Sequence, residues 1–279
     1  MIGRIKNIRR TAYNRFSKSQ AYNALKRITL LRRMKLMLGT LIWRTAPYNF
    51  PLHGDPIAIR LFEMLVKEGK IKAIVETGTF RGYTTSLLAK KFPNIPIHTC
   101  EINDYNFKKA KENLKVFKNV SVYHNTSPKF LAQLIKDRII SDRVLFYLDA
   151  HWLDEWPLEE EMQIISSKIK SAFIVIDDFK VPGDDRFAFD KYKDKECSLD
   201  MVNPNIIKPN SYQNLFPNYG EEVYRKDIAH PNLVGYVIIF QNFFKEFKKL
   251  NQTDFVRRFF KDRTDLMKKN RSKIGEKEI

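Results

Sequence analysis

The sequence predicts an α/β protein with a doubly wound, mostly parallel sheet of seven strands and helices on both faces. Between residues 72 and 179, short apolar runs alternate with longer amphipathic runs, which is the pattern of βαβ units. A strongly apolar run at 233–240 and a weaker one at 221–225 supply two further strands. With 279 residues and 43% hydrophobic content, the chain can bury a full core.

Each element follows from a local pattern. Strands are expected at 73–78, 95–102, 120–125, 143–150 and 172–178, where apolar and β-branched residues are concentrated. Helices are expected between them, at about 84–92, 104–117, 128–138 and 157–170. Residues 182–220 are rich in Pro, Gly, Asp and Asn with interleaved aromatic residues. This segment is predicted to be a structured loop that serves as a lid on a domain spanning 51–240.

The positive charge is confined to the two ends of the chain. Residues 1–50 hold 12 Lys/Arg and no Asp/Glu, and residues 241–279 hold 12 against 6, which leaves 26 of each sign in between. Apolar residues recur at helical spacing within the first segment. We therefore predict a basic helical arm at 1–50 and a basic helical tail at 241–279. The arm is expected to bind an anionic membrane surface, or else to pack on the domain or on a second subunit of a homo-oligomer.

The cysteine content and the start of the chain indicate a compartment. Two cysteines give neither a disulfide framework nor a paired metal-ligand spacing. No N-terminal run has the apolar length of a signal peptide or a membrane span. We expect a cytoplasmic protein that associates peripherally with the inner membrane of a bacterium.

The first strand runs into VETGTFRGYTT, in which Glu76, Gly78 and Gly82 precede a helix. Glycines at such a turn let the backbone approach a ligand, and the helix N-terminus offers unpaired N–H groups. The spacing is not the GxGxxG of dinucleotide binders. Glu101 ends the second strand, where an acidic side chain can accept both hydroxyls of a ribose. Together these residues predict a nucleoside-containing cofactor.

Two later apolar runs, LFYLDAHW and FIVIDDF, end in Asp149, Asp177 and Asp178. Because the carboxyl ends of parallel strands meet at one edge of a sheet, the three carboxylates should converge there. Their mutual repulsion favours a bound cation, and Mg²⁺ prefers oxygen ligands. His151 lies two residues beyond Asp149 and should face the same side of an extended segment. It is the candidate general base, with Lys180 as the next candidate.

VETGTFRGYTT, CEIND, LDAHW and IDDF, in this order on successive strands, resemble the class I S-adenosylmethionine (SAM) methyltransferases, with their Rossmann-like fold. The similarity is greatest to the metal-dependent O-methyltransferases of the catechol and macrocin types, and covers roughly residues 55–240. The resemblance implies that Glu76, Gly78 and Gly82 hold the methionine part of SAM and that Glu101 holds its ribose. It places Ser127 near the adenine, and Asp149, Asp177 and Asp178 around Mg²⁺.

The phrase LDAHWLDEW departs from the catechol type because it lacks the lysine that serves there as the base. This favours His151 as the base and a sugar, glycolipid or other hydroxylated small molecule as the acceptor. Two other functions stay open: a nucleic-acid methyltransferase, and a membrane-associated binding module without catalysis. The neutral middle of the chain disfavours nucleic acid. Cofactor binding without turnover would favour the binding module. As a separate alternative, Gly78 and Gly82 would belong to an ordinary strand-to-helix turn, and Asp177 and Asp178 would be helix or turn residues without a metal.

Overall fold

The computed structural model describes residues 50–150, 156–206, 211–220 and 233–257. The predicted basic arm, residues 221–225 and most of the basic tail lie outside the described residues. Within the described ranges, no helix has the length and apolarity that a membrane crossing requires.

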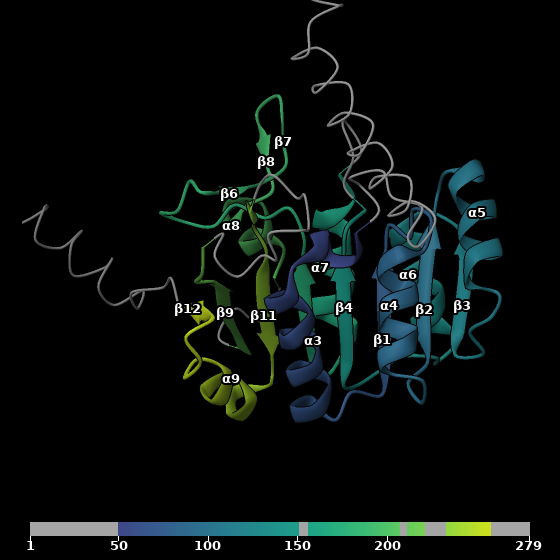
Figure 1. Ribbon diagram of the computed structural model, residues 1–279, viewed down its shortest axis with the longest axis horizontal. Helices are drawn as coiled ribbons and strands as arrows, with labels where there is room; N and C mark the ends of the chain where they lie inside the picture. Colours follow the sequence, from purple (N-terminus) through teal and green to yellow (C-terminus); the bar gives the residue numbers. More distant parts are fainter. Residues whose placement is uncertain (1–49, 151–155, 207–210, 221–232, 258–279) are drawn as a thin grey trace, which may run out of the picture. The chain divides into compact units, whose positions relative to one another are not determined.

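The main sheet has eight described strands in the order β12-β9-β11-β5-β4-β1-β2-β3, which stand side by side in Figure 1. The parallel strands are β1 (Ala73–Thr77), β2 (Ile97–Glu101), β3 (Val120–His124), β4 (Val144–Leu148) and β5 (Ala172–Ile176). β11 (Val237–Gln241) runs antiparallel to β5, and β9 (Tyr212–Pro217) runs antiparallel to both β11 and β12 (Val256–Arg257). The mostly parallel sheet confirms the predicted fold class, with one strand more than predicted.

Two pairs of helices connect the parallel strands. α4 (Tyr83–Lys91) and α5 (Asp104–Leu114) join β1 to β2 and β2 to β3, whereas α6 (Ser127–Lys136) and α7 (Leu158–Lys168) join β3 to β4 and β4 to β5. The strand order reverses at β1, so right-handed crossovers place the two pairs on opposite faces. The contacts agree, because α4 packs on α5 and α6 packs on α7. All four helices lie within three residues of their predicted bounds.

A further helix precedes the first strand. The helix α3 (Pro56–Gly69) follows a short 3₁₀ turn, η2 (Pro51–Gly54). Asp55 is its N-cap, and the Asp55 carboxylate accepts hydrogen bonds from the backbone N–H groups of Ile57 and Ala58 at 2.7 and 3.0 Å. Pro56 at the first helical position and the buried positions Leu61 and Leu65 are ordinary helix signals. The sequence prediction nevertheless omitted this helix.

Two predictions about the C-terminal half were wrong in part. The run at 233–240 was predicted as one strand, but Leu233–Val234 (β10) pairs with Phe187–Ala188 (β6), and only β11 joins the main sheet. Gly235 lies between these two strands, and a larger residue would not fit there because a Cβ atom would lie 2.2 Å from the carbonyl oxygen of Phe179. The segment 182–220, predicted as a loop, contains β9 of the main sheet.

Shorter elements complete the C-terminal half. The segment 182–220 also contains the two-residue strands β7 (Lys191–Tyr192) and β8 (Lys195–Glu196), the helix α8 (Leu199–Val202) and the 3₁₀ turn η3 (Asn203–Asn205). In the predicted basic tail, the described part forms the helix α9 (Phe244–Leu250), which contacts α3, and the edge strand β12. That part of the tail is therefore integrated into the domain.

The core lies on both faces of the central strands. Every residue of β1, β2, β4, β5 and β11 is buried, whereas the edge strand β3 is only partly buried. Strands buried on both faces read as continuous apolar runs, which is why β1, β4 and β5 were predicted to within a few residues. The carboxyl ends of β1, β2, β4 and β5 carry the predicted site residues.

Candidate active site

The glycine turn after β1 requires glycine at two positions. Gly78 and Gly82 have φ angles of +83° and +82°, which only glycine adopts readily. A Cβ atom on Gly78 would lie 2.0 Å from the carbonyl oxygen of Asp149, whereas one on Gly82 would lie 2.8 Å from the Leu114 side chain. The predicted cofactor turn and the predicted metal ligand Asp149 are therefore in direct backbone contact.

Glu76 supports this turn from inside the sheet. Its carboxylate is 1% exposed and accepts hydrogen bonds from the hydroxyl groups of Thr85 and Thr99, the latter at 2.6 Å. Burial raises the pKa of Glu76 to about 7, although the two hydroxyl groups oppose that rise. These bonds tie β1 to β2 and α4. The role of Glu76 in binding the cofactor stays a prediction.

Glu101 lies at the predicted position, at the carboxyl end of β2. Its Oε2 accepts the backbone N–H of Phe80 at 2.7 Å, and its Oε1 accepts that of Asn103 at 2.8 Å. Burial raises its pKa, and the backbone hydrogen bonds oppose this. Each oxygen retains lone pairs for further hydrogen bonds, because a carboxylate can accept about four. The arrangement suits a ribose.

Ser127 begins α6, and its Oγ atom is buried. Thr77 Oγ1 and Glu161 Oε1 are also buried, and the hydroxyl groups of Ser127 and Thr77 lie near the Glu161 carboxylate. Burial raises the pKa of Glu161 to about 7, and the nearby Ser127 and Thr77 hydroxyl groups lower it by less. The sequence prediction included Ser127 but not Glu161, which lies in an acidic run that resembled an exposed helix face.

The three predicted metal ligands interact electrostatically at the ends of β4 and β5. Burial, followed by the charges of Asp177 and Asp178, raises the pKa of Asp149 well above its usual value. The pKa of Asp178 is raised to about 7, mainly by burial and secondly by the negative charge of Asp177. Asp178 also has a φ of +46°, an uncommon conformation for a residue other than glycine. Carboxylates that raise one another's pKa are the donor set that a divalent cation would neutralise, so these residues fit such an ion.

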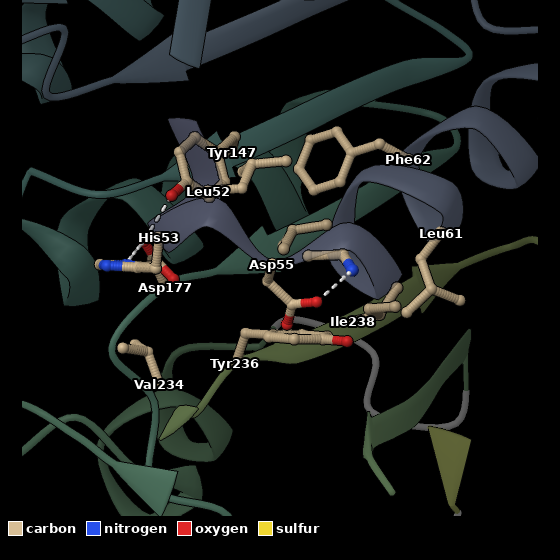
Figure 2. Close-up of a pocket in the computed structure, with 12 residues that line it drawn as sticks. Leu52, His53, Asp55, Leu61, Phe62, Tyr147, Asp177, Val234, Tyr236 and Ile238 are labelled. Atoms are coloured by element: carbon tan, nitrogen blue, oxygen red, sulfur yellow. Dashed lines mark hydrogen bonds and ion pairs between the residues drawn. The ribbon is translucent and has the colours of Figure 1, made fainter. Parts of the chain in front are cut away.

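His53 joins this group, although the sequence analysis gave it no role. Its Nε2 lies 2.7 Å from Oδ2 of Asp177 (Figure 2) and 4.0 Å from Oδ1 of Asp178. Burial lowers the pKa of His53, but the charges of Asp177, Asp178 and Asp55 outweigh that effect and raise it to about 9. The hydroxyl group of Tyr147 donates a second hydrogen bond to Asp177.

The donor atoms of His53, Asp177 and Asp178 lie within 4.8 Å of one another, and Asp149 is outside this group. His151 lies outside the described residues. Lys180, the alternative base, forms an ion pair with Glu196 at 2.5 Å. The metal and base assignments made from the sequence therefore stay predictions.

A pocket opens beside His53 and Asp177, between α3 and the sheet. Figure 2 shows its polar groups, His53, Asp55, Asp177 and Tyr236, beside apolar side chains of α3 and β11. Asp55 accepts a hydrogen bond from Tyr219, whose hydroxyl group lies 2.9 Å from that of Tyr236. The lining of the pocket is mainly apolar, with a few polar groups at one side.

Comparison with known proteins identifies the class of the domain. Residues 56–178, which contain the glycine turn, Glu101 and all three aspartates, match the model of the O-methyltransferase family. This region is therefore similar to the O-methyltransferases, and the domain is a SAM-dependent methyltransferase, as its resemblance implied. No curated protein sequence matches the chain.

The solved structures that are similar to this chain have low sequence identity to it. An O-methyltransferase from Bacillus cereus in complex with SAH is 15% identical over 67% of this chain and 81% of that one, with a TM-score of 0.46. TomG from Streptomyces achromogenes, an O-methyltransferase involved in tomaymycin synthesis and solved with SAM, is 15% identical over 66% and 79%, with a TM-score of 0.45.

Proposed function

We propose that this domain transfers the methyl group of SAM to a hydroxyl group of a small molecule, sugar or glycolipid, assisted by Mg²⁺ or a similar divalent cation. One observation carries the proposal: the glycine turn at residues 78–82 (the cofactor turn) contacts the acidic group, which consists of Asp149, Asp177 and Asp178. A Cβ atom added to Gly78 would lie 2.0 Å from the carbonyl oxygen of Asp149. The backbone N–H of Asp149 in turn donates a hydrogen bond to the carbonyl oxygen of Thr77 at 3.0 Å.

The residues divide into two sets with separate tasks. Gly78, Gly82 and Glu101 would hold SAM, which supplies an activated methyl group when bound. Asp149, Asp177 and Asp178 would hold the cation, which when bound supplies Lewis acidity that favours an ionised hydroxyl group. Placing two reactants side by side can contribute roughly 7 to 11 kcal/mol, so the protein needs few catalytic groups.

The chain itself supplies positioning and a route for the proton. Tyr147 donates a hydrogen bond to Asp177 and so fixes the direction of that carboxylate. His151 is the proposed acceptor of the hydroxyl proton, because its unperturbed pKa of about 6.5 suits a base near neutrality.

The test replaces one proposed ligand and measures cofactor binding and turnover separately. In the Asp178→Ala variant, metal-stimulated methylation of a hydroxylated acceptor should be lost while SAM affinity stays nearly unchanged. The matched control is Asp185→Ala, which removes an aspartate from the same half of the chain outside the acidic group. Full activity of EDTA-treated protein would show that no cation is required.

A further inference from the structure

The turn that carries His53 has an unusual backbone. Leu52, His53 and Gly54 have φ angles of +49°, +53° and +74°, so three successive residues adopt left-handed conformations. For residues other than glycine such conformations are unfavourable, and they persist only where the surroundings fix them. The turn brings the His53 side chain to Asp177, 124 residues later in the sequence.

Both sides of the turn are fixed to the rest of the domain. Leu52 is buried, and its N–H donates to Oγ1 of Thr84 in α4 at 3.3 Å. On the other side, the buried Asp55 caps α3 and accepts a hydrogen bond from Tyr219. His53 is therefore held beside the acidic group by packing and hydrogen bonds on both flanks.

We propose that His53 is a nitrogen ligand of the cation bound by Asp177 and Asp178, and that the site thereby selects a divalent transition-metal ion over Mg²⁺. This inference rests on the proposed function, which places a cation at the acidic group. It changes the expected chemistry of the site from oxygen ligands alone to a mixed set of nitrogen and oxygen.

The distances allow this coordination with little movement. With metal–ligand bonds of about 2.1 Å, two adjacent ligand atoms of an octahedron are about 3.0 Å apart and two opposite ones about 4.2 Å. Nε2 of His53 lies 2.7 Å from an Asp177 oxygen and 4.0 Å from an Asp178 oxygen. The three donor atoms also lie within 4.8 Å of one another. One ion can therefore contact all three after small side-chain adjustments.

The identity of the added ligand sets the selectivity. Carboxylate oxygen suits Mg²⁺ and Mn²⁺, whereas imidazole nitrogen binds transition-metal ions much better than it binds Mg²⁺. Loss of His53 should therefore weaken Mn²⁺ binding more than Mg²⁺ binding. A role for His53 that only positions Asp177 would instead weaken the binding of both ions in the same proportion.

The experiment loads the full chain with Mn²⁺ and records pulsed electron paramagnetic resonance. We expect a coupling to ¹⁴N in the unmutated protein that changes to the ¹⁵N pattern when histidine is ¹⁵N-labelled. In His53→Gln the coupling should be absent. Titrations should show Mn²⁺ affinity at least about tenfold weaker and Mg²⁺ affinity changed by less than about threefold. An unchanged SAM titration would show that this variant is folded.

His124→Gln is the matched control. His124 ends β3, which β2, β1 and β4 separate from β5, and its ring stacks on Phe107. If His53→Gln does not fold, single Gln variants of His98, His124, His151 and His230 identify the ligand by elimination, because each should retain the coupling. A bound Mn²⁺ without nitrogen coupling, or a coupling that persists in His53→Gln, would overturn the inference. Unmutated protein that binds neither Mn²⁺ nor Mg²⁺ would overturn the proposed metal assistance as well.

Discussion

The backbone N–H of Phe80 donates a hydrogen bond to Oε2 of Glu101 at 2.7 Å, so the acid at the end of β2 is attached to the glycine turn after β1. Phe80 itself has a φ of +49°, and this conformation lets its N–H point at the carboxylate. The two predicted parts of the cofactor site therefore form one hydrogen-bonded unit. Cofactor affinity and the order of the turn should change together when Glu101 is replaced.

Replacement of Glu101 tests this unit. Glu101→Ala should weaken SAM binding by about 1 to 3 kcal/mol, the range for loss of hydrogen bonds to a charged group. Glu101→Gln keeps one acceptor oxygen and should therefore lose less SAM affinity than Glu101→Ala. Isothermal titration with SAM measures both variants, and titration of NAD serves as the negative control. Unchanged SAM affinity in Glu101→Ala would remove the ribose assignment.

The sequence was sufficient for the parallel half of the sheet. β1, β4 and β5 are buried on both faces, so each appears as an apolar run, and the aspartates that follow β4 and β5 stand out by contrast. Convergence of strand ends then predicts that these acids interact, and the raised pKa values of Asp149 and Asp178 agree with that expectation.

Long-range pairing explains what the sequence did not reveal. β9 has the sequence YQNLFP, without apolar alternation, and it becomes a strand because β11 and β12 pair with it. His53 lies on a turn outside the sheet and meets Asp177, 124 residues later, because tertiary contacts such as that of η2 with α4 hold the turn in place. No local pattern encodes either contact, although the Asp55–Pro56 helix start could have drawn attention to the turn.

The two glycines of the cofactor turn form a matched pair for a stability measurement. Both have nearly the same positive φ, but an added Cβ meets the Asp149 carbonyl at position 78 and the Leu114 side chain at position 82. Gly82→Ala should cost about 1 to 3 kcal/mol of unfolding free energy from backbone strain. Gly78→Ala should cost more, because a backbone carbonyl yields less readily than a side chain. Denaturant unfolding of both variants measures the difference, and equal costs would contradict the importance of the Asp149 contact.

The basic arm at residues 1–50 gives a prediction about partners. With 12 basic and no acidic residues, it should bind anionic vesicles, at about 1 kcal/mol per charge at most and less at high salt. Flotation of the full chain with anionic vesicles measures this, and neutral vesicles are the control. Replacing Arg32, Arg33 and Lys35 by Gln should reduce flotation. If the protein stays at the bottom of the flotation gradient with anionic vesicles at low salt, the proposed membrane binding of the arm is wrong.

The buried Glu161 gives a prediction about pH. Burial raises its pKa from 4.5 to about 7 in the folded protein, so between these values the folded state binds more protons than the unfolded state. The contribution of Glu161 to stability should therefore fall as the pH rises from about 4.5 to about 7, and stay constant above that. The full effect is on the order of 3 kcal/mol.

Glu161→Gln removes this titration without changing the shape of the side chain. Below pH 4.5 the variant and the unmutated protein should unfold at similar denaturant concentrations, because both side chains are neutral there. At pH 8 the variant should be more stable, because the unmutated protein then holds an ionised carboxylate on a side chain that is only 1% exposed. Glu159→Gln, which removes an exposed glutamate on the same helix, is the control and should leave the pH dependence unchanged. A stability difference that does not vary with pH would show that Glu161 has an ordinary pKa.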